Sequence, residues 1–195
     1  MPFGRAALVV TLVGSLTSCA TLQQIAALRQ VDFSVDRLSD VRLAGVDLAR
    51  VRTYSQLSVT EAARLASAVA QRTVPMDFTV HLTAVNPEDN SVDARLVQMD
   101  WTLLLQERET LSGTFADETL LRRGQPTDVP IDVSLDLLDF FQGSAQDLFD
   151  LATSIADPAA PPTDVALRAT PTVDTALGPI RYPRPITIVS RQVGG

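Results

Sequence analysis

The chain has 195 residues, of which 46% are hydrophobic, and a formal net charge of −7 at pH 7. This apolar content is enough to fill a core, which argues against a wholly disordered chain. The negative charge argues against nucleic acid and anionic lipid headgroups as electrostatic partners.

Residues 1–19 have the organisation of a secretory signal. Arg5 precedes an apolar run over residues 6–16, which is too short to span a bilayer because a spanning helix needs about 20 apolar residues. The run ends in Leu16-Thr17-Ser18-Cys19, which contains the only cysteine. This stretch resembles the lipobox of bacterial lipoproteins, an apolar residue and two small residues before a cysteine. The alternative is an ordinary signal peptide cleaved near Ala20, which leaves a free or paired cysteine.

The lipobox interpretation divides the chain into three parts. Residues 1–18 are removed, residues 19–30 form a short tether, and residues 31–195 form one domain. We expect Cys19 to bear the lipid, so that the membrane is the first partner. Ala20 is compatible with sorting to the outer membrane of a Gram-negative cell, facing the periplasm. With Cys19 acylated no thiol remains, which excludes disulfides and cysteine metal sites.

Apolar and polar residues alternate in several short segments after residue 30, which is the pattern of half-buried strands. Gly45, Asn86-Pro87 and Gly124-Gln125-Pro126 mark bulges or turns between or within them. The regular spacing predicts a mainly β fold, an antiparallel β-sandwich of fibronectin or immunoglobulin type with about seven strands. The inward-facing strand residues that we expect are Val31, Phe33, Val35, Met76, Phe78, Val80, Leu82, Ala84, Val97, Met99, Trp101, Leu103, Leu105, Leu111, Gly113, Phe115, Val129, Ile131, Val133, Leu135, Leu137, Val165, Leu167 and Ala169.

Two serines predict the starts of two helices. Ser58, with Glu61 three residues later, forms a capping box and begins a helix that runs to about Arg72. We expect an alanine-rich face of this helix to pack on a sheet and Ala68 to lie on the opposite face. Ser144 caps a second helix, which lies in a predicted insertion over residues 138–162. The residues expected on the packed face of the first helix are Val59, Ala62, Ala63, Ala66, Val69 and Ala70.

The strand from Phe78 to Ala84 and the Asn86-Pro87 after it resemble the group-2 late embryogenesis abundant domain, the LEA14-like or water-stress and hypersensitive-response domain. The later features that fit its order are Gly113, Gly124, the strand from Val129 to Leu135 and a closing hairpin over residues 165–189. The resemblance covers roughly residues 31–190. It implies a small β-sandwich with one helix, a role in stress protection and no accepted catalytic residues. Residues 138–162 depart from the family pattern.

Few residues in the sequence are candidates for chemistry. His81 is the only histidine, and its place on the polar face of a strand predicts a solvent-facing side chain rather than a catalytic one. Asp128, Asp132 and Asp136 line one face of a strand, as a solvated stripe or, alternatively, as a cation site. Trp101 belongs to the core rather than to a sugar-binding platform. No nucleophile elbow, phosphate loop or zinc-helix motif is present, so we expect neither an enzyme nor a cofactor or metal.

An apolar segment outside the strands leaves two functions open. It contains Leu137, Phe140, Phe141, Leu148 and Phe149, which either close one end of the sandwich or form a surface for a lipid or partner protein. The first interpretation predicts a non-catalytic binding or desiccation-protective module on an envelope membrane. The second predicts a carrier of a lipid or other hydrophobic ligand in an apolar cleft over residues 137–155. A cavity under the second helix would favour the carrier.

Overall fold

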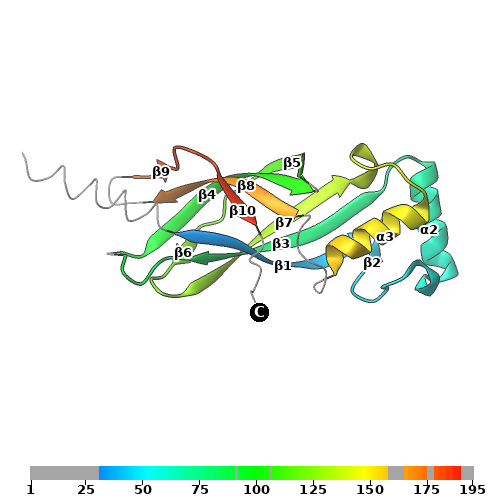
Figure 1. The fold of residues 1–195 in the computed structure, drawn as a ribbon, viewed down its shortest axis with the longest axis horizontal. Coiled ribbons are helices and arrows are strands. Elements are labelled where there is room, and N and C mark those ends of the chain that lie inside the picture. Colours follow the sequence, from blue (N-terminus) through cyan, green and yellow to red (C-terminus); the bar gives the residue numbers. More distant parts are fainter. Residues whose placement is uncertain (1–30, 91, 106, 158–164, 175–177, 190–195) are drawn as a thin grey trace, which may run out of the picture.

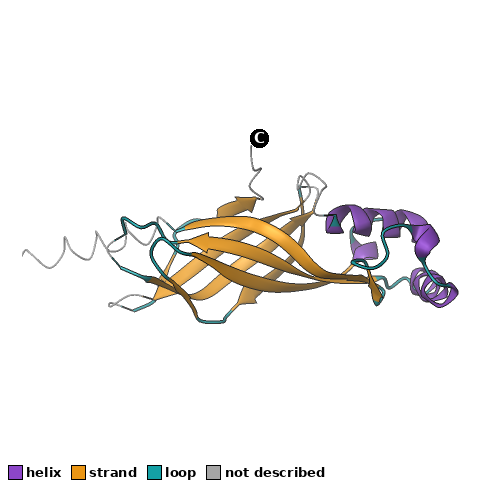
Figure 2. Cartoon of the chain, turned by 90° about the horizontal axis from the view of Figure 1, so that it is seen from below, coloured by secondary structure: helices purple, strands orange, loops and turns teal. Residues whose placement is uncertain are grey.

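The computed structural model describes residues 31–90, 92–105, 107–157, 165–174 and 178–189. These residues form ten strands in two antiparallel sheets that pack as a sandwich, with the helices gathered at one end (Figure 1, Figure 2). The prediction of a mainly β sandwich is confirmed. The lipobox and the tether lie outside the described residues.

The first sheet has four strands in the order β2-β1-β3-β7, and the second has β10-β8-β4-β5 with β6 and β9 paired at its margins. Seven strands have four residues or more and account for the predicted number, while β2, β6 and β9 are shorter additions. The strand bounds are β1 Asp32–Leu43, β2 Val46–Asp47, β3 Pro75–Val85, β4 Ala94–Leu105, β5 Arg108–Phe115, β6 Thr119–Leu121, β7 Pro126–Asp136, β8 Val165–Asp174, β9 Ile180–Arg181 and β10 Ile186–Val189.

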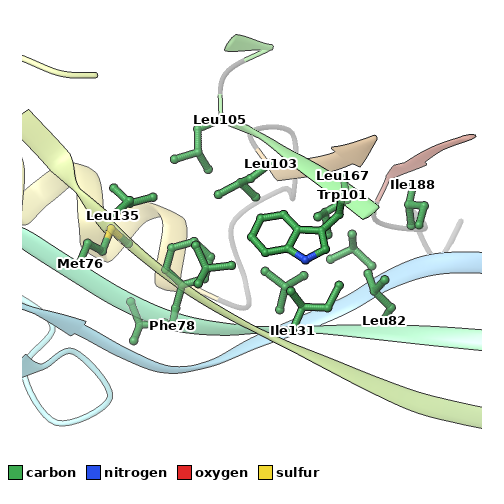
Figure 3. Close-up of a cluster of buried hydrophobic side chains, with 14 of the residues drawn as sticks. Met76, Phe78, Leu82, Trp101, Leu103, Leu105, Ile131, Leu135, Leu167 and Ile188 are labelled. Carbon is green, nitrogen blue, oxygen red and sulfur yellow. The ribbon is translucent and has the colours of Figure 1, made fainter. Parts of the chain in front are cut away.

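The core lies between the inner faces of the two sheets. The indole of Trp101 lies among apolar side chains from both sheets, as Figure 3 shows, and Trp101 is 7% exposed, which confirms its predicted core position. Val97 is an exception to the predicted inward face. A bulge between Leu96 and Gln98 shifts the register of β4, so Leu96 and Met99 point inward and Val97 does not.

The helical end of the molecule consists of four short elements, which we call the helical cap. They are η1 Tyr54–Gln56, α2 Val59–Ala70, η2 Leu137–Asp139 and α3 Ala145–Ala156. Both predicted capping boxes are present, because Ser58 accepts from the backbone N–H of Glu61 and Ser144 accepts from that of Asp147. The two helix starts predicted from the sequence are therefore confirmed.

The predicted packing face of α2 is wrong for four of its six residues, since only Ala62 and Val69 among them are half-buried. Leu65 is its one fully buried side chain, Ala68 is half-buried against the core, and Ala66 is exposed. Val59 is 88% exposed. Burying a leucine removes far more apolar surface from water than burying an alanine, so Leu65 fixes the inward stripe. The alanines contribute helix propensity instead. The helix also packs at the end of the sandwich, where it contacts α3, rather than on the flat of a sheet (Figure 1).

Candidate functional site

The outer face of the β1–β3–β7 sheet brings His81 beside three polar side chains that are far apart in the sequence. The ladder pairs Arg37 of β1 with His81 of β3, and Asp128 of β7 pairs with Thr83, two residues further along β3. A bulge in β1 at residues 35–37 sets the register in which Ser39 pairs with Thr79, within reach of the imidazole, and a second bulge follows at residues 39–42. Asp40, within the second bulge, has a positive φ of 55°.

The imidazole has a carboxylate at one nitrogen and a hydroxyl at the other. Nδ1 lies 2.9 Å and 3.0 Å from the two carboxylate oxygens of Asp128, which accept a hydrogen when Nδ1 carries one. Nε2 lies 2.9 Å from Oγ of Ser39. Arg37 Nη2 lies 3.1 Å from Nδ1 and 3.8 Å from Asp128 Oδ2, so its positive charge also faces that carboxylate. The resulting order is hydroxyl, imidazole, carboxylate.

This cluster differs from what the sequence predicted for His81. The histidine does lie on the polar face, yet its side chain is only 13% exposed, against 49% for Asp128. The hydroxyl of Ser39 also lies 2.8 Å from Oδ2 of Asp40, so its proton has two acceptors. Sequence reasoning missed Ser39 and Arg37, because their proximity depends on the strand register and the bulge at residues 35–37. The only signal of this cluster in the sequence is that it contains a histidine, serines and aspartates, the residue types from which such clusters are built.

The predicted aspartate stripe on β7 is divided among three separate partners. Asp128 contacts His81, Asp132 accepts from the Thr79 hydroxyl at 2.7 Å, and Asp136 accepts from the backbone N–H groups of Val74 and Leu138, each at 3.0 Å. The half-buried Asp136 thus joins β7 to the helical cap. No cluster of three metal-ligating side chains occurs among the residues that the structure describes.

The molecule has a shallow hollow on the outer face of each sheet. The hollow beside the His81 cluster measures about 280 Å³ and is lined by Asp40, Arg42, Asp77, Phe78, Thr79, Asp132, Val133 and Ser134. The other, about 420 Å³, is lined by Asp100, Trp101, Thr102, Ser112, Gly113, Thr114, Arg168, Thr170 and Pro185. Both are lined mainly by polar side chains, so neither is the apolar cleft that the carrier interpretation requires.

The charged side chains around the second hollow, Asp100 and Arg168, each pair with a residue of opposite charge. Asp100 accepts hydrogen bonds from Gln98, Arg181 and Thr114, in that order of effect, and these lower the pKa of its carboxyl group. Arg168 of β8 forms an ion pair across β4 with Glu109 of the edge strand β5. These contacts hold the outer face of the second sheet together, and half-exposed pairs of this kind contribute little to the free energy of unfolding.

The apolar segment after β7 belongs to the core of the helical cap. Leu137, Leu148 and Phe149 are 0–1% exposed, and Phe140 and Phe141 are half-buried against the same core. The ring of Phe149 meets that of Tyr54 edge to face, with centroids 5.8 Å apart. The segment therefore closes one end of the sandwich, and three of its five large side chains are withdrawn from any partner.

The Asn86-Pro87 motif has a structural role at the opposite end. Asn86 is fully buried, and its side-chain amide donates to the carbonyl oxygens of Val92 and Leu121 at 3.1 Å and 3.0 Å. Its own Oδ1 accepts from the amide of Asn90 at 2.5 Å. The motif thus joins the β3–β4 loop to β6, a role the sequence analysis missed when it treated Asn86 as a turn signal alone.

Comparisons with known proteins give structural likenesses only. No protein-family model and no curated protein matches the chain. A solution structure of a candidate late embryogenesis abundant (LEA) protein, At2g46140.1, is similar, with 16% identity, a TM-score of 0.37, and 89% of this chain and 79% of that one covered. The structural-genomics target SoR45 has 9% identity and a TM-score of 0.41 over 85% and 90% of the two chains. A candidate ApaA protein from Bordetella pertussis has 12% identity and a TM-score of 0.33 over 84% and 97%.

These scores are too low to establish a family, so the LEA14-like resemblance stays a prediction from the sequence motif. Within the described part of the chain, no helix is long and apolar enough to cross a membrane. The sites that the structure adds are thus the His81 cluster, the two polar hollows and the closed helical cap.

Proposed function

We propose that this chain is a bacterial envelope lipoprotein whose LEA14-like sandwich is a binding or stress-protective module rather than an enzyme. Cys19 attaches the lipid, and the domain acts from the membrane surface through its folded exterior. In a Gram-negative cell the location is the outer membrane, facing the periplasm. Two or three acyl chains hold the protein firmly, because each buried methylene contributes about 0.8 kcal/mol.

The closed core is the observation that supports a surface-acting module over a carrier. Leu137, Leu148 and Phe149 fill the space under α3 in which a hydrophobic ligand would have to lie. Both hollows are open, and most of the residues that line them are polar. A lipid carrier needs an apolar cavity, because transfer of acyl chains from a membrane must be matched by apolar burial in the protein.

The geometry of the sandwich also supports a defined orientation. The first described residue, Val31, precedes β1 at the Asn86 end, where Asp32 pairs with Val85. The helical cap lies at the other end of the molecule (Figure 1). Residues 20–30 join Cys19 to Val31 and reach at most about 40 Å. With the proposed lipid on Cys19, the Asn86 end is the end joined to the tether, and the helical cap is the end farther from it.

Membrane attachment is tested by mass spectrometry of the N-terminal peptide and by cell fractionation. We expect Cys19 as the mature N-terminus with thioether-linked and amide-linked lipid, and release of Cys19→Ala from the membrane fraction. The matched control is Thr17→Ser, which keeps a small residue in the lipobox and leaves fractionation unchanged. An unmodified Cys19, or a Cys19→Ala protein that still fractionates with membranes, contradicts the attachment.

The protective role is tested by deleting the gene and scoring survival after drying and osmotic shock. We expect lower survival, restored by the wild-type gene and not by Cys19→Ala. Organic extraction of the purified protein, followed by lipid mass spectrometry, tests the carrier at the same time. A stoichiometric lipid beyond the N-terminal anchor would favour the carrier. Unchanged survival under every envelope stress would remove the protective role.

A further inference from the structure

Ser39, His81 and Asp128 have the mutual arrangement of a nucleophile, a general base and an orienting carboxylate. Ser39 Oγ contacts Nε2 of His81 at 2.9 Å, and Asp128 contacts Nδ1 at 2.9 Å. These are the two nitrogens that nucleophilic catalysis requires in these roles, since the base must accept at one nitrogen while the other is held as N–H. The three residues come from adjacent strands, β1, β3 and β7, so a rigid sheet fixes their positions.

We propose that Ser39 is an activated nucleophile that accepts an acyl group from a small activated ester. His81 Nε2 takes the hydroxyl proton as Ser39 Oγ attacks the acyl carbon. The bond from that carbon to the leaving oxygen breaks, and the proton passes from His81 to the departing alcohol. The products are an ester on Ser39 and the free alcohol. This assignment does not rest on the proposed envelope function.

The charges around the cluster match this chemistry. Asp128 lies at Nδ1 and Asp40 lies beside the hydroxyl at Nε2, so carboxylates flank the imidazolium that forms, while the guanidinium of Arg37 near Nδ1 opposes its charge. Asp36 pairs with Arg37 at 2.6 Å and holds its guanidinium in place. A carboxylate at Nδ1 keeps the ring in the productive tautomer and stabilises its protonated form.

The neighbouring hollow indicates the class of ester. It begins at Asp40 and Thr79, the chain neighbour and the cross-strand partner of Ser39. Its charged residues are Asp40, Asp77, Asp132 and Arg42, so acid outnumbers base. A neutral or cationic acyl group is therefore favoured over an anionic one. The cluster lies on an open sheet face, so we assign acylation of the serine rather than rapid turnover.

The test is acetylation of the full lipidated chain in detergent by 4-nitrophenyl acetate, followed by peptide mass spectrometry and nitrophenolate release. The sequence contains no lysine, so acylation of side-chain amines does not compete. We expect one acetyl group on Ser39 and none on the matched control Ser134. Ser134 lines the same hollow and donates to Asp77 at 2.6 Å, but its partner is a carboxylate without an imidazole. A succinyl ester, which is anionic, should react more slowly than the acetyl ester.

Three variants test whether Ser39 reacts because His81 activates its hydroxyl or only because that hydroxyl is exposed. Ser39→Ala should abolish labelling, and His81→Gln should slow it on the order of 10²-fold, because a positioned general base contributes at least that much. Asp128→Asn, at a half-exposed position, keeps the fold even where His81→Gln weakens it. It should slow labelling while thermal unfolding stays unchanged, because the ring loses the carboxylate that orients it. A merely structural role would lower the unfolding temperature together with the labelling rate.

The possible results either support or contradict the assignment of Ser39 as a nucleophile. Labelling confined to Ser39, slowed in His81→Gln with unchanged thermal unfolding, supports it. Release of many equivalents of nitrophenolate also supports it, and would at the same time overturn the non-catalytic part of the proposed function. Acetyl groups spread evenly over several hydroxyls, or a folded His81→Gln protein labelled at the wild-type rate, would overturn the assignment and leave the envelope module untouched.

Discussion

Helices α2 and α3 begin in the same way but end up in different surroundings. Each has twelve residues and follows a serine that forms a capping box. Helix α3 buries Leu148, Phe149 and Ala152, whereas α2 buries Leu65 alone. Helix α3 lies against β1, and α2 contacts α3 from outside (Figure 2). The N-terminal capping box thus determines where a helix begins, whereas the position of the helix in the fold determines how many of its side chains are buried.

Truncation of Phe149 should have the largest effect on this comparison. The ring is fully buried and contacts Tyr54, so Phe149→Ala leaves a cavity where the helical cap meets the sandwich. We expect a loss of about 3–5 kcal/mol in the free energy of unfolding, measured by urea titration of the full chain. The matched control is Phe140→Ala, a half-buried phenylalanine in the same segment, which should lose clearly less. Equal losses would mean that the cap has no well-packed centre.

Truncation of Leu65 tests the single anchor of the outer helix. Leu65 is 0% exposed and is the only fully buried residue of α2. We expect Leu65→Ala to lower the free energy of unfolding by about 2–4 kcal/mol, in the range of buried leucines. The loss should be below that of Phe149→Ala, because the outer helix can move inward and partly fill the cavity. A larger loss than at Phe149 would place the centre of the cap on α2.

The parts of this fold that were predictable are those with local signals. Alternation marks the strands because one sheet face is buried, and Ser58 and Ser144 mark helix starts because the capping bonds span three residues. The buried face of α2 was not predictable in this way, because apolar residues lie on more than one side of the helix and its position in the fold decides that Leu65 is buried.

The His81 cluster was beyond the sequence for a different reason. Its members are brought together by the register of three strands, and the bulge at residues 35–37 of β1 sets the register that puts Ser39 near Nε2. A shift of one residue would turn each side chain to the other face of the sheet. Residue types alone therefore identified His81 and Asp128 as polar-face residues without showing that they touch.

Enlarging two alanines of α2 distinguishes its true face from the predicted one. Ala68 is half-buried against the core, so Ala68→Leu should overpack the contact and lower the free energy of unfolding by about 1–3 kcal/mol. Ala66 is exposed, so Ala66→Leu should stay within about 0.5 kcal/mol of the wild type. Urea titration measures both variants. The reverse order of effects would restore the alanine face that the sequence predicted.

Removal of the two capping serines should have a small effect that is alike in the two helices. Ser58→Ala and Ser144→Ala each remove a side chain that accepts from a backbone N–H in the first turn, which contributes about 1 kcal/mol to stability.

The bonds that Glu61 and Asp147 receive from these serines lower the pKa of both carboxyl groups. A carboxyl group with a lowered folded-state pKa stabilises the fold above its unfolded-state pKa, and this contribution is lost as the pH falls through the folded-state value. The difference in thermal unfolding temperature between wild type and each variant should therefore be larger at pH 7 than at about pH 3. A difference that is unchanged by acid would show that the carboxylates take no part in the caps, and a much larger effect at Ser144 would show that burial, rather than the local bonds, sets the strength of a cap.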